Sequence, residues 1–228
     1  MHFEILVENK SGKKMLEELV PKILEAKDTC NIFSFKGLGH LPKNLDKKTD
    51  PNKRILLARL PMLLQSYGKT FSNYPPNYPA TVIVVCDLDK RNRKAFHNEL
   101  LSVLNSCDPA PETRFCLAIE EGEAWLLGDL AAIKAAYPKA RNKILKGYVN
   151  DSICGTWEKL ADAVYPGGAK ALSARGWQTV GIEKFKWAEN ISPHMNVDEN
   201  HSPSFIRFRD NLQNLSRKNA ATNNDATA

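Results

Sequence analysis

The stretch "ATVIVVCDLDKRNRK", residues 80–94, joins a continuous apolar run to two aspartates, Asp87 and Asp89, and then to four cationic residues. An apolar run without polar alternation is typical of a strand that is buried on both faces of a parallel sheet. In open parallel sheets, ligands bind beyond the carboxyl ends of the strands. We therefore expect the two aspartates to lie at a ligand-binding edge of an α/β fold.

The segments on either side extend this pattern, because short β-rich runs alternate with amphipathic helical segments. The expected strands are residues 3–7, 31–35, 80–87 and 114–120. The expected helices are residues 11–27, 54–68, 93–106 and 123–137. Ser11 is the expected cap of the first helix. The alternation predicts an α/β fold, in which a parallel sheet of about four strands is flanked by helices.

No further strand is expected after about residue 130. The segments that predict a C-terminal helical extension are residues 156–165, 182–191 and 203–218. We therefore divide the chain into a core at residues 1–130, a helical extension packed on it at residues 131–217, and a tail at residues 218–228. The tail is small and polar, so we expect it to be disordered.

The composition narrows the class of protein. The 228 residues carry a net charge of +6, which favours an anionic partner. No apolar stretch reaches the roughly 18 residues that a membrane span needs, and the start "MHFEILVENK" lacks the features of a secretion signal. The five cysteines form no CxxC pair and the five histidines show no HxxxH spacing, so neither a disulfide framework nor a zinc site is expected. We expect a cytoplasmic protein with reduced, buried thiols.

Acidic residues follow three of the four expected strands. They are Glu8 after the first strand, Asp87 and Asp89 after the third, and Glu120, Glu121 and Glu123 after the fourth. Because alternate residues of an extended segment share a face, the two aspartates are expected to point together, as are Glu121 and Glu123. Carboxylates that meet at one edge repel one another unless a cation neutralises them. Hard oxygen ligands without His or Cys select Mg²⁺ or Mn²⁺, which serve phosphoryl chemistry. The alternative is that these acids lie singly in the first turns of helices, where the helix dipole favours negative charge.

Three segments resemble the Toprim family. "ILVENKSGKKMLEELVPKIL" resembles the opening motif, in which a glutamate ends the first strand, and "VIVVCDLD" resembles the DxD motif. "IEEGEAWLLGD" resembles the ExEAW segment of standalone Toprim-like proteins related to OLD-family nucleases, and the likeness extends over residues 3 to about 210. Asn9 departs from the family pattern, which has a small residue at that position.

The resemblance implies roles for individual residues. Glu8 corresponds to the catalytic glutamate, and Lys184 or Lys186 to a lysine that stabilises transition-state charge. The implied metal ligands are Glu8, Asp87, Asp89, Glu121 and Glu123. The implied activity is that of a nuclease that uses Mg²⁺ or Mn²⁺ to cut phosphodiester bonds in DNA or RNA.

The expected binding partners of the chain are a nucleic acid and an ATPase. The basic segments 36–54 and 90–94 are candidates for phosphate contacts. Some proteins of the resembling group are encoded beside AAA- or ABC-type ATPases, which suggests the effector of an antiviral defence or toxin system. The four tryptophans, Trp125, Trp157, Trp177 and Trp187, are expected in the core rather than stacked on bases.

Two alternatives remain open, and so does assembly into a homo-oligomer. The chain could be a non-catalytic, Toprim-shaped subunit that docks on an ATPase or a nucleic acid. It could also transfer phosphate on a nucleotide or another small phosphate ester.

Overall fold

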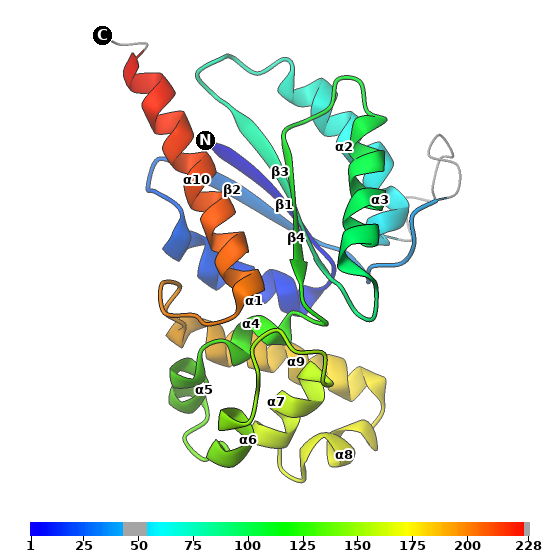
Figure 1. Cartoon of the computed structure of the whole chain (residues 1–228), viewed down its shortest axis with the longest axis vertical. Helices are drawn as coiled ribbons and strands as arrows, with labels where there is room; N and C mark the ends of the chain where they lie inside the picture. The colour runs from blue at the N-terminus through cyan, green and yellow to red at the C-terminus, as the bar shows by residue number, and fades with distance from the viewer. Residues whose placement is uncertain (43–53, 226–228) are drawn as a thin grey trace.

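Four parallel strands form the centre of the protein, in a computed structural model that describes residues 1–42 and 54–225. The strands are β1 (His2–Val7), β2 (Thr29–Ser34), β3 (Ala80–Asp87) and β4 (Thr113–Ala118). Their order in the sheet is β2-β1-β3-β4, so β1 and β3 are the inner strands (Figure 1). The predicted α/β fold, with a four-stranded parallel sheet flanked by helices and a helical C-terminal part, is confirmed.

The register aligns the carboxyl ends of the strands at one edge of the sheet. Val7 of β1 pairs with Ser34 of β2 and with Val85 of β3. Asp87, at the end of β3, pairs with Ala118 of β4. Residues that directly follow β1 and β4 therefore emerge beside the end of β3, although they lie far apart in the sequence.

Each face of the sheet is covered by helices. Helices α2 (Leu56–Phe71) and α3 (Arg93–Asn105) pack on one face, where Leu6, Val82 and Val84 meet apolar side chains of both helices. Helices α1 (Lys10–Ile23) and α10 (Pro203–Asp225) pack on the other face, against the alternate residues of the same strands. Burial on both faces explains why the inner strand β3 is apolar along most of its length, whereas the edge strand β2 alternates between exposed and partly buried residues.

The remaining helices gather beyond the carboxyl edge of the sheet (Figure 1). They are α4 (Glu123–Leu127), α5 (Leu130–Ala136), α6 (Asn142–Lys146), α7 (Thr156–Val164), α8 (Gly168–Ser173), α9 (Trp177–Ile191) and the 3-10 helix η2 (Ser192–His194). Helix α9 packs along α1, and its buried residues belong to the same core as α1 and α10. The helical layer therefore covers the edge at which the acidic residues emerge.

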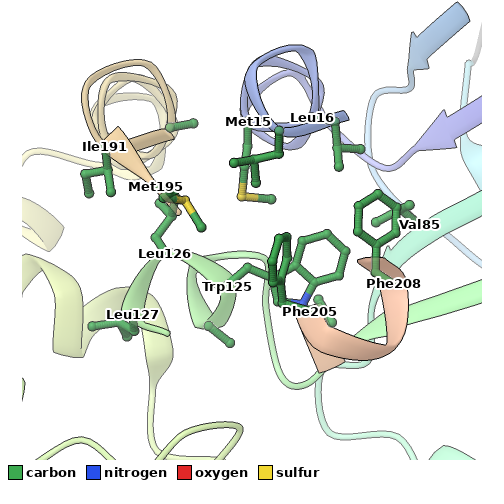
Figure 2. Packing of buried hydrophobic residues seen from close by; sticks show 14 of the residues in the cluster. Met15, Leu16, Val85, Trp125, Leu126, Leu127, Ile191, Met195, Phe205 and Phe208 are labelled. Carbon is green, nitrogen blue, oxygen red and sulfur yellow. The ribbon is translucent and has the colours of Figure 1, made fainter. Parts of the chain in front are cut away.

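Trp125 joins the helical layer to the sheet. Its ring is fully buried and stacks on Phe208 at a centroid distance of 4.9 Å, with Phe205 edge-on at 5.6 Å (Figure 2). The indole nitrogen Nε1 donates a hydrogen bond to Ser204 Oγ at 2.9 Å, so the buried polar atom of the ring is satisfied. Helix α4, which begins with Glu123, is thus fixed against α10.

Several local predictions are wrong in detail. Asn9, rather than Ser11, caps α1, because its side-chain Oδ1 accepts a hydrogen bond from the backbone N–H of Gly12 at 2.7 Å. The helix expected at residues 123–137 is two helices, because Asp129 caps α5 through the backbone N–H of Ala132. Helix α10 continues to Asp225, so the tail expected to be disordered is helical over residues 218–225.

The expectation of buried thiols is only partly correct. All five cysteines are free, but Cys154 is exposed and Cys30 is only partly buried. Within residues 1–42 and 54–225, the helices lack the combination of length and apolar character that crossing a bilayer requires.

Two helical glycines provide a matched test of this packing. A Cβ at Gly68 of α2 would lie 1.8 Å from the backbone oxygen of Pro109, whereas a Cβ at Gly181 of α9 would have no heavy atom of residues 1–42 or 54–225 within 4 Å. We expect Gly68→Ala to lower the free energy of unfolding by about 1–3 kcal/mol, the usual effect of overpacking. Gly181→Ala should raise it by about 0.5–1 kcal/mol, because glycine is a poor helix former. Urea denaturation measures both, and equal effects of the two substitutions would contradict the packing of α2.

Candidate active site at the carboxyl edge of the sheet

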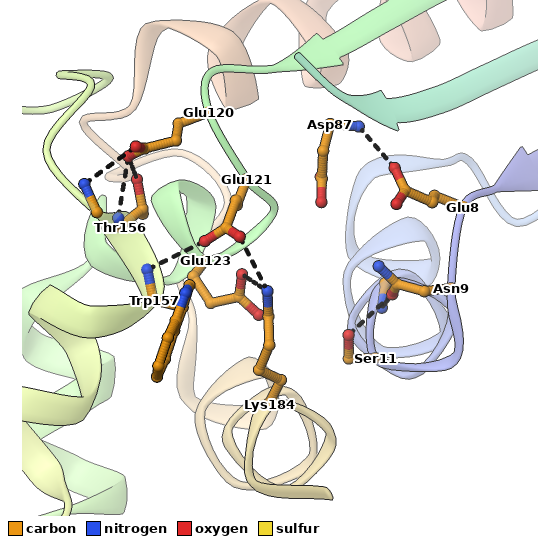
Figure 3. Close-up of polar contacts among 12 residues, drawn as sticks. Glu8, Asn9, Ser11, Asp87, Glu120, Glu121, Glu123, Thr156, Trp157 and Lys184 are labelled. Carbon is orange, nitrogen blue, oxygen red and sulfur yellow. Dashed lines mark hydrogen bonds and ion pairs between the residues drawn. The ribbon is translucent and has the colours of Figure 1, made fainter. Parts of the chain in front are cut away.

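Glu8 and Asp87 meet at the ends of the two inner strands. The carboxylate of Glu8 accepts a hydrogen bond from the backbone N–H of Asp87, at 3.3 Å from Oε2. Both side chains are directed into the space between the sheet edge and the helical layer (Figure 3). The adjacency follows from the parallel pairing of β1 and β3, as expected from the sequence.

The two carboxyl groups have raised pKa values. Burial is the largest cause for both, and each is also affected by a neighbouring negative charge. Burial and the charge of Glu8 raise the pKa of Asp87 well above its ordinary value of 3.8. The pKa of Glu8 is raised by burial and by Asp89, although the backbone N–H of Asp87 opposes this. Within the described residues, no group donates a hydrogen bond to the Asp87 carboxylate, so its charge is poorly compensated.

The start of α1 holds the Glu8 segment in place. Asn9 Oδ1 accepts hydrogen bonds from the backbone N–H of Gly12 and from Ser11 Oγ, at 2.7 and 2.8 Å. A Cβ at Gly12 would lie 2.7 Å from Cγ2 of Val7, so the absence of a side chain lets the helix approach the strand closely. Asn9, the residue that departs from the Toprim pattern, is therefore the N-cap that ends the Glu8 turn.

Glu121 and Glu123 converge on Lys184 of α9. The ammonium Nζ of Lys184 lies 3.0 Å from Oε2 of Glu123 and 3.4 Å from Oε1 of Glu121 (Figure 3). Both acids come from the turn after β4, and Glu123 is the first residue of α4. Lys186, the other lysine considered, instead pairs with Glu183 at 2.7 Å and is exposed.

The charges of this group depend on one another. Burial lowers the pKa of Lys184, but the opposing effect of Glu123, Glu121 and Asp87 is larger and raises it, so the side chain stays cationic. Burial, together with the charge of Glu123, raises the pKa of Glu121 to about 7, although Lys184 lowers it. A buried ammonium therefore neutralises an acidic region that has more negative than positive groups.

Glu120 is structural. Its carboxylate accepts hydrogen bonds from the backbone N–H groups of Cys154, Gly155 and Thr156, at 2.9–3.1 Å, and from the hydroxyl of Thr156. Burial raises its pKa, but these hydrogen bonds outweigh burial and lower it below the ordinary 4.5. Glu121 adds a fourth backbone contact, because its Oε2 accepts a hydrogen bond from Trp157 N at 3.2 Å. The start of α7 is thus held by two acids from the turn after β4.

Asp89 does not share a face with Asp87. Strand β3 ends at Asp87, and Asp89 adopts a left-handed backbone conformation with φ of 50°. Its half-exposed carboxylate pairs with Arg91 at 2.8 Å. The prediction that the two aspartates point together required an extended backbone as far as Asp89, but the strand ends at Asp87. Asp89 still affects the site, because its charge raises the pKa of Glu8.

The five expected metal ligands do not form one shell. Within the part of the chain that the structure describes, no three or more His, Cys, Asp or Glu side chains are close enough together to hold a metal. Instead, a cavity of about 20 Å³ lies beside Glu8, Asp87 and Glu123. This is enough for about one water molecule. Mg²⁺ is often held by only one or two carboxylates, with water and substrate phosphates as its other ligands. The Glu8–Asp87 pair resembles such a site more than one in which protein side chains supply every ligand.

Only one of the two basic segments is described in full. Residues 43–53 of the segment 36–54 lie outside the described residues, and Arg54 donates a hydrogen bond to the backbone oxygen of Ser34. The segment 90–94 lies in the turn after β3 and at the start of α3, where all of its residues except Arg91 are exposed. Arg91 is partly buried, pairs with Asp89 and lies over the ring of Phe96.

The fold and the site define an α/β protein with a carboxylate pair and a lysine-bridged acid pair at the carboxyl edge of a parallel sheet. The chain belongs to a family described as "Domain of unknown function (DUF4276)", whose model matches residues 7–213 and therefore includes all of these side chains. No curated protein and no solved structure matches the chain.

The ion pairs of Lys184 can be tested against those of Lys186. Lys184→Met should lower the free energy of unfolding by on the order of 3 kcal/mol, because it leaves two buried carboxylates without their counter-charge. Lys186→Met removes an exposed pair and should have little effect. The deficit of Lys184→Met should shrink as the pH falls below about 7, where Glu121 becomes protonated. Urea denaturation across this range measures both, and a deficit that does not depend on pH would contradict the assignment.

The raised pKa of Asp87 predicts a substitution that stabilises the protein. A carboxyl group with a raised folded-state pKa favours folding while it is protonated, and this contribution is lost as the pH rises above its unfolded value. Without metal at neutral pH, Asp87→Asn should therefore have a higher melting temperature than the unsubstituted protein. The difference should vanish near and below the ordinary pKa of 3.8. A lower melting temperature at neutral pH would show that Asp87 is well compensated in the folded state.

Proposed function

We propose that the chain is a Mg²⁺- or Mn²⁺-dependent hydrolase that cleaves phosphodiester bonds in nucleic acid. The observation that carries the proposal is the Glu8–Asp87 pair, in which two partly buried carboxyl groups face one small cavity. Perturbed carboxyl groups that meet in a cavity are characteristic of functional sites. The resemblance of the segments around these residues to the Toprim family supports the same activity.

The donor set fits a hard divalent cation. Glu8 and Asp87 would hold the ion, with Glu123 beside the same cavity, and neither His nor Cys lines that cavity. When bound, the ion supplies Lewis-acid polarisation of a phosphate and activation of the attacking water. Its positive charge would also relieve the repulsion that raises the pKa of Asp87.

Two side chains have roles of their own in this proposal. Lys184 keeps its positive charge, because three carboxylates raise its pKa, and this charge stabilises negative charge that develops on a phosphate. Burial raises the pKa of Glu8 above its ordinary value of 4.5, and a raised pKa suits a carboxyl group that accepts or donates a proton during catalysis. Glu121 and Glu123 orient the lysine and do not act on the substrate directly.

The segment 90–94 begins close to Asp87, and its exposed residues Lys90, Arg93 and Lys94 supply cations for the phosphates that flank the cut. An ATPase partner, and a role in antiviral defence or as a toxin, rest on the sequence resemblance alone.

A non-catalytic binding subunit is the second candidate, and the ion pairs favour it. Lys184 already neutralises Glu121 and Glu123, and Arg91 already pairs with Asp89. In such a subunit these acids would stabilise the helical layer and would not bind a metal.

Metal binding and cleavage separate the two candidates. Saturating Mn²⁺ should raise the melting temperature of the unsubstituted protein, since a ligand at 100 times its dissociation constant stabilises by about 2.7 kcal/mol. Glu8→Gln and Asp87→Asn should abolish this shift. Both should also reduce cleavage of plasmid, single-stranded DNA or tRNA by at least about 100-fold, within the range for lost acid–base groups.

Glu112→Gln is the matched control, because the exposed Glu112 lies at the opposite end of β4 and pairs with the partly buried Arg114. It should leave metal binding and cleavage unchanged. Absence of both a Mn²⁺-dependent shift and cleavage in the unsubstituted protein would reject the hydrolase and favour the binding subunit. Hydrolysis of small phosphate esters alone would indicate a phosphatase-like activity.

A further inference from the structure

Trp177 is the exception among the four tryptophans. The rings of Trp125, Trp157 and Trp187 are buried, as the sequence predicts, but Trp177 is 78% exposed at the first position of α9. Holding a large aromatic ring in water forfeits the stabilisation of about 1.5–3 kcal/mol that a buried large apolar side chain provides. Packing within the described residues therefore does not explain why a tryptophan occupies this exposed position.

A short series of contacts connects Trp177 to the candidate active site. Its ring lies edge-on to that of Trp157, with 6.1 Å between the centroids. The backbone N–H of Trp157 donates a hydrogen bond to Glu121, which also contacts Lys184. Trp177 and Lys184 are seven residues apart on α9, so they lie on the same side of the helix, about 10 Å apart along its axis. The exposed ring therefore lies about two helical turns from Lys184, on the same side of α9.

The backbone leaves space around the exposed ring. Residues of a helix cover the turn that precedes them, so the residue at position 181 would lean over position 177. That residue is Gly181, and a Cβ there would meet no heavy atom of the described residues within 4 Å. Gly176, directly before Trp177, has a φ of 86° and also has open space around it. Glycines on either side thus leave the ring accessible to a flat ligand.

The sequence next to Trp177 is basic. Residues 165–182 include two cations, Lys170 and Arg175, and no acidic residue, while Asp162 and Glu183 lie just outside this range. Both cations are exposed, and Arg175 lies two residues before the ring. An apolar protein partner would match the ring but not these charges, whereas a nucleic acid supplies both a flat base and negative phosphates.

We propose that Trp177 stacks on a nucleobase of a single-stranded nucleic acid whose phosphate backbone runs towards Lys184. The inference rests on the proposed function and specifies its substrate class. In a duplex, bases are stacked on one another, so a side-chain ring can stack only on a base that is unpaired or flipped out. A stacking residue beside the catalytic groups therefore selects single strands, loops or frayed ends over intact duplex.

Binding is tested without cleavage, using the full-length protein with EDTA and a fluorescein-labelled oligothymidylate. Fluorescence anisotropy gives the affinity. Trp177→Ala should weaken binding roughly 5- to 150-fold, which corresponds to the 1–3 kcal/mol of a base–aromatic stack. Trp177→Phe keeps a ring and should give an intermediate affinity. The intrinsic tryptophan fluorescence should be quenched on binding in the unsubstituted protein and much less in Trp177→Phe.

Two controls isolate the stacking contact. Ile182→Ala removes another exposed apolar side chain of α9, 55% exposed, and should leave binding unchanged. An abasic oligomer of the same length keeps the phosphates but lacks bases, so the unsubstituted protein and Trp177→Ala should bind it equally. Circular dichroism should be the same for every variant, because neither side chain is buried.

The outcomes separate this inference from the hydrolase proposal. If oligothymidylate binds with the same affinity to Trp177→Ala and to the unsubstituted protein, or binds to neither, the stacking role is overturned and the ring is better explained as a protein contact. If Trp177→Ala weakens binding but no variant cleaves with Mn²⁺, the stacking role stands and the hydrolase fails. If the protein cleaves and Trp177→Ala cleaves single strands equally well, the hydrolase stands and the stacking role fails.

Discussion

The central constraint on this structure is an excess of negative charge at the carboxyl edge of the sheet, where Lys184 is the cation that contacts Glu121 and Glu123. That lysine comes from α9, far along the chain, so the edge is completed only when the helical layer packs on α1. Lys22 of α1 contributes to this packing, because its ammonium donates hydrogen bonds to the carbonyl oxygens of Ser192, Pro193 and Met195 at 2.8–3.1 Å. Charge balance at the site therefore depends on tertiary packing between α1 and α9.

The negative charges of the acids at this edge are compensated to different degrees. This difference distinguishes a candidate site from a structural ion-pair cluster. The charge of Glu120 is well compensated, because four hydrogen-bond donors contact its carboxylate and lower its pKa. Asp87 is at the other extreme, since burial and Glu8 raise its pKa and no described group donates a hydrogen bond to its carboxylate. A protein under selection for stability alone would have little reason to keep a poorly compensated carboxyl group at this position. Such a group is common where a ligand supplies the missing charge.

The sequence predicts the fold and the Glu8–Asp87 pair well, for a physical reason. Parallel strands align their carboxyl ends, so two acids that follow inner strands must emerge side by side. The position of Asp89 could not be predicted in this way, because the left-handed backbone at that residue depends on the turn into α3. The role of Glu120 was also missed, since its partners, residues 154–156, lie more than thirty positions away and carry no cap signal for a distant acid. The exposure of Trp177 was missed because an aromatic residue in a helical pattern usually packs inward.

The contacts made by Glu120 and Glu121 explain how the edge of the sheet and the exposed surface of α9 form one unit. These neighbouring acids bind the start of α7, and the residue that Glu121 holds there, Trp157, is the one that supports Trp177. Glu121 also contacts Lys184, so a single carboxylate contacts both this lysine and the segment beneath the exposed ring. A substrate that touches both positions would therefore be held by groups with a fixed relative geometry, and such preorganisation is what a hydrolase needs in order to place a phosphate accurately. The same rigidity would be of little use to a subunit that only docks on a partner, because docking does not require a lysine to be positioned relative to a carboxylate pair.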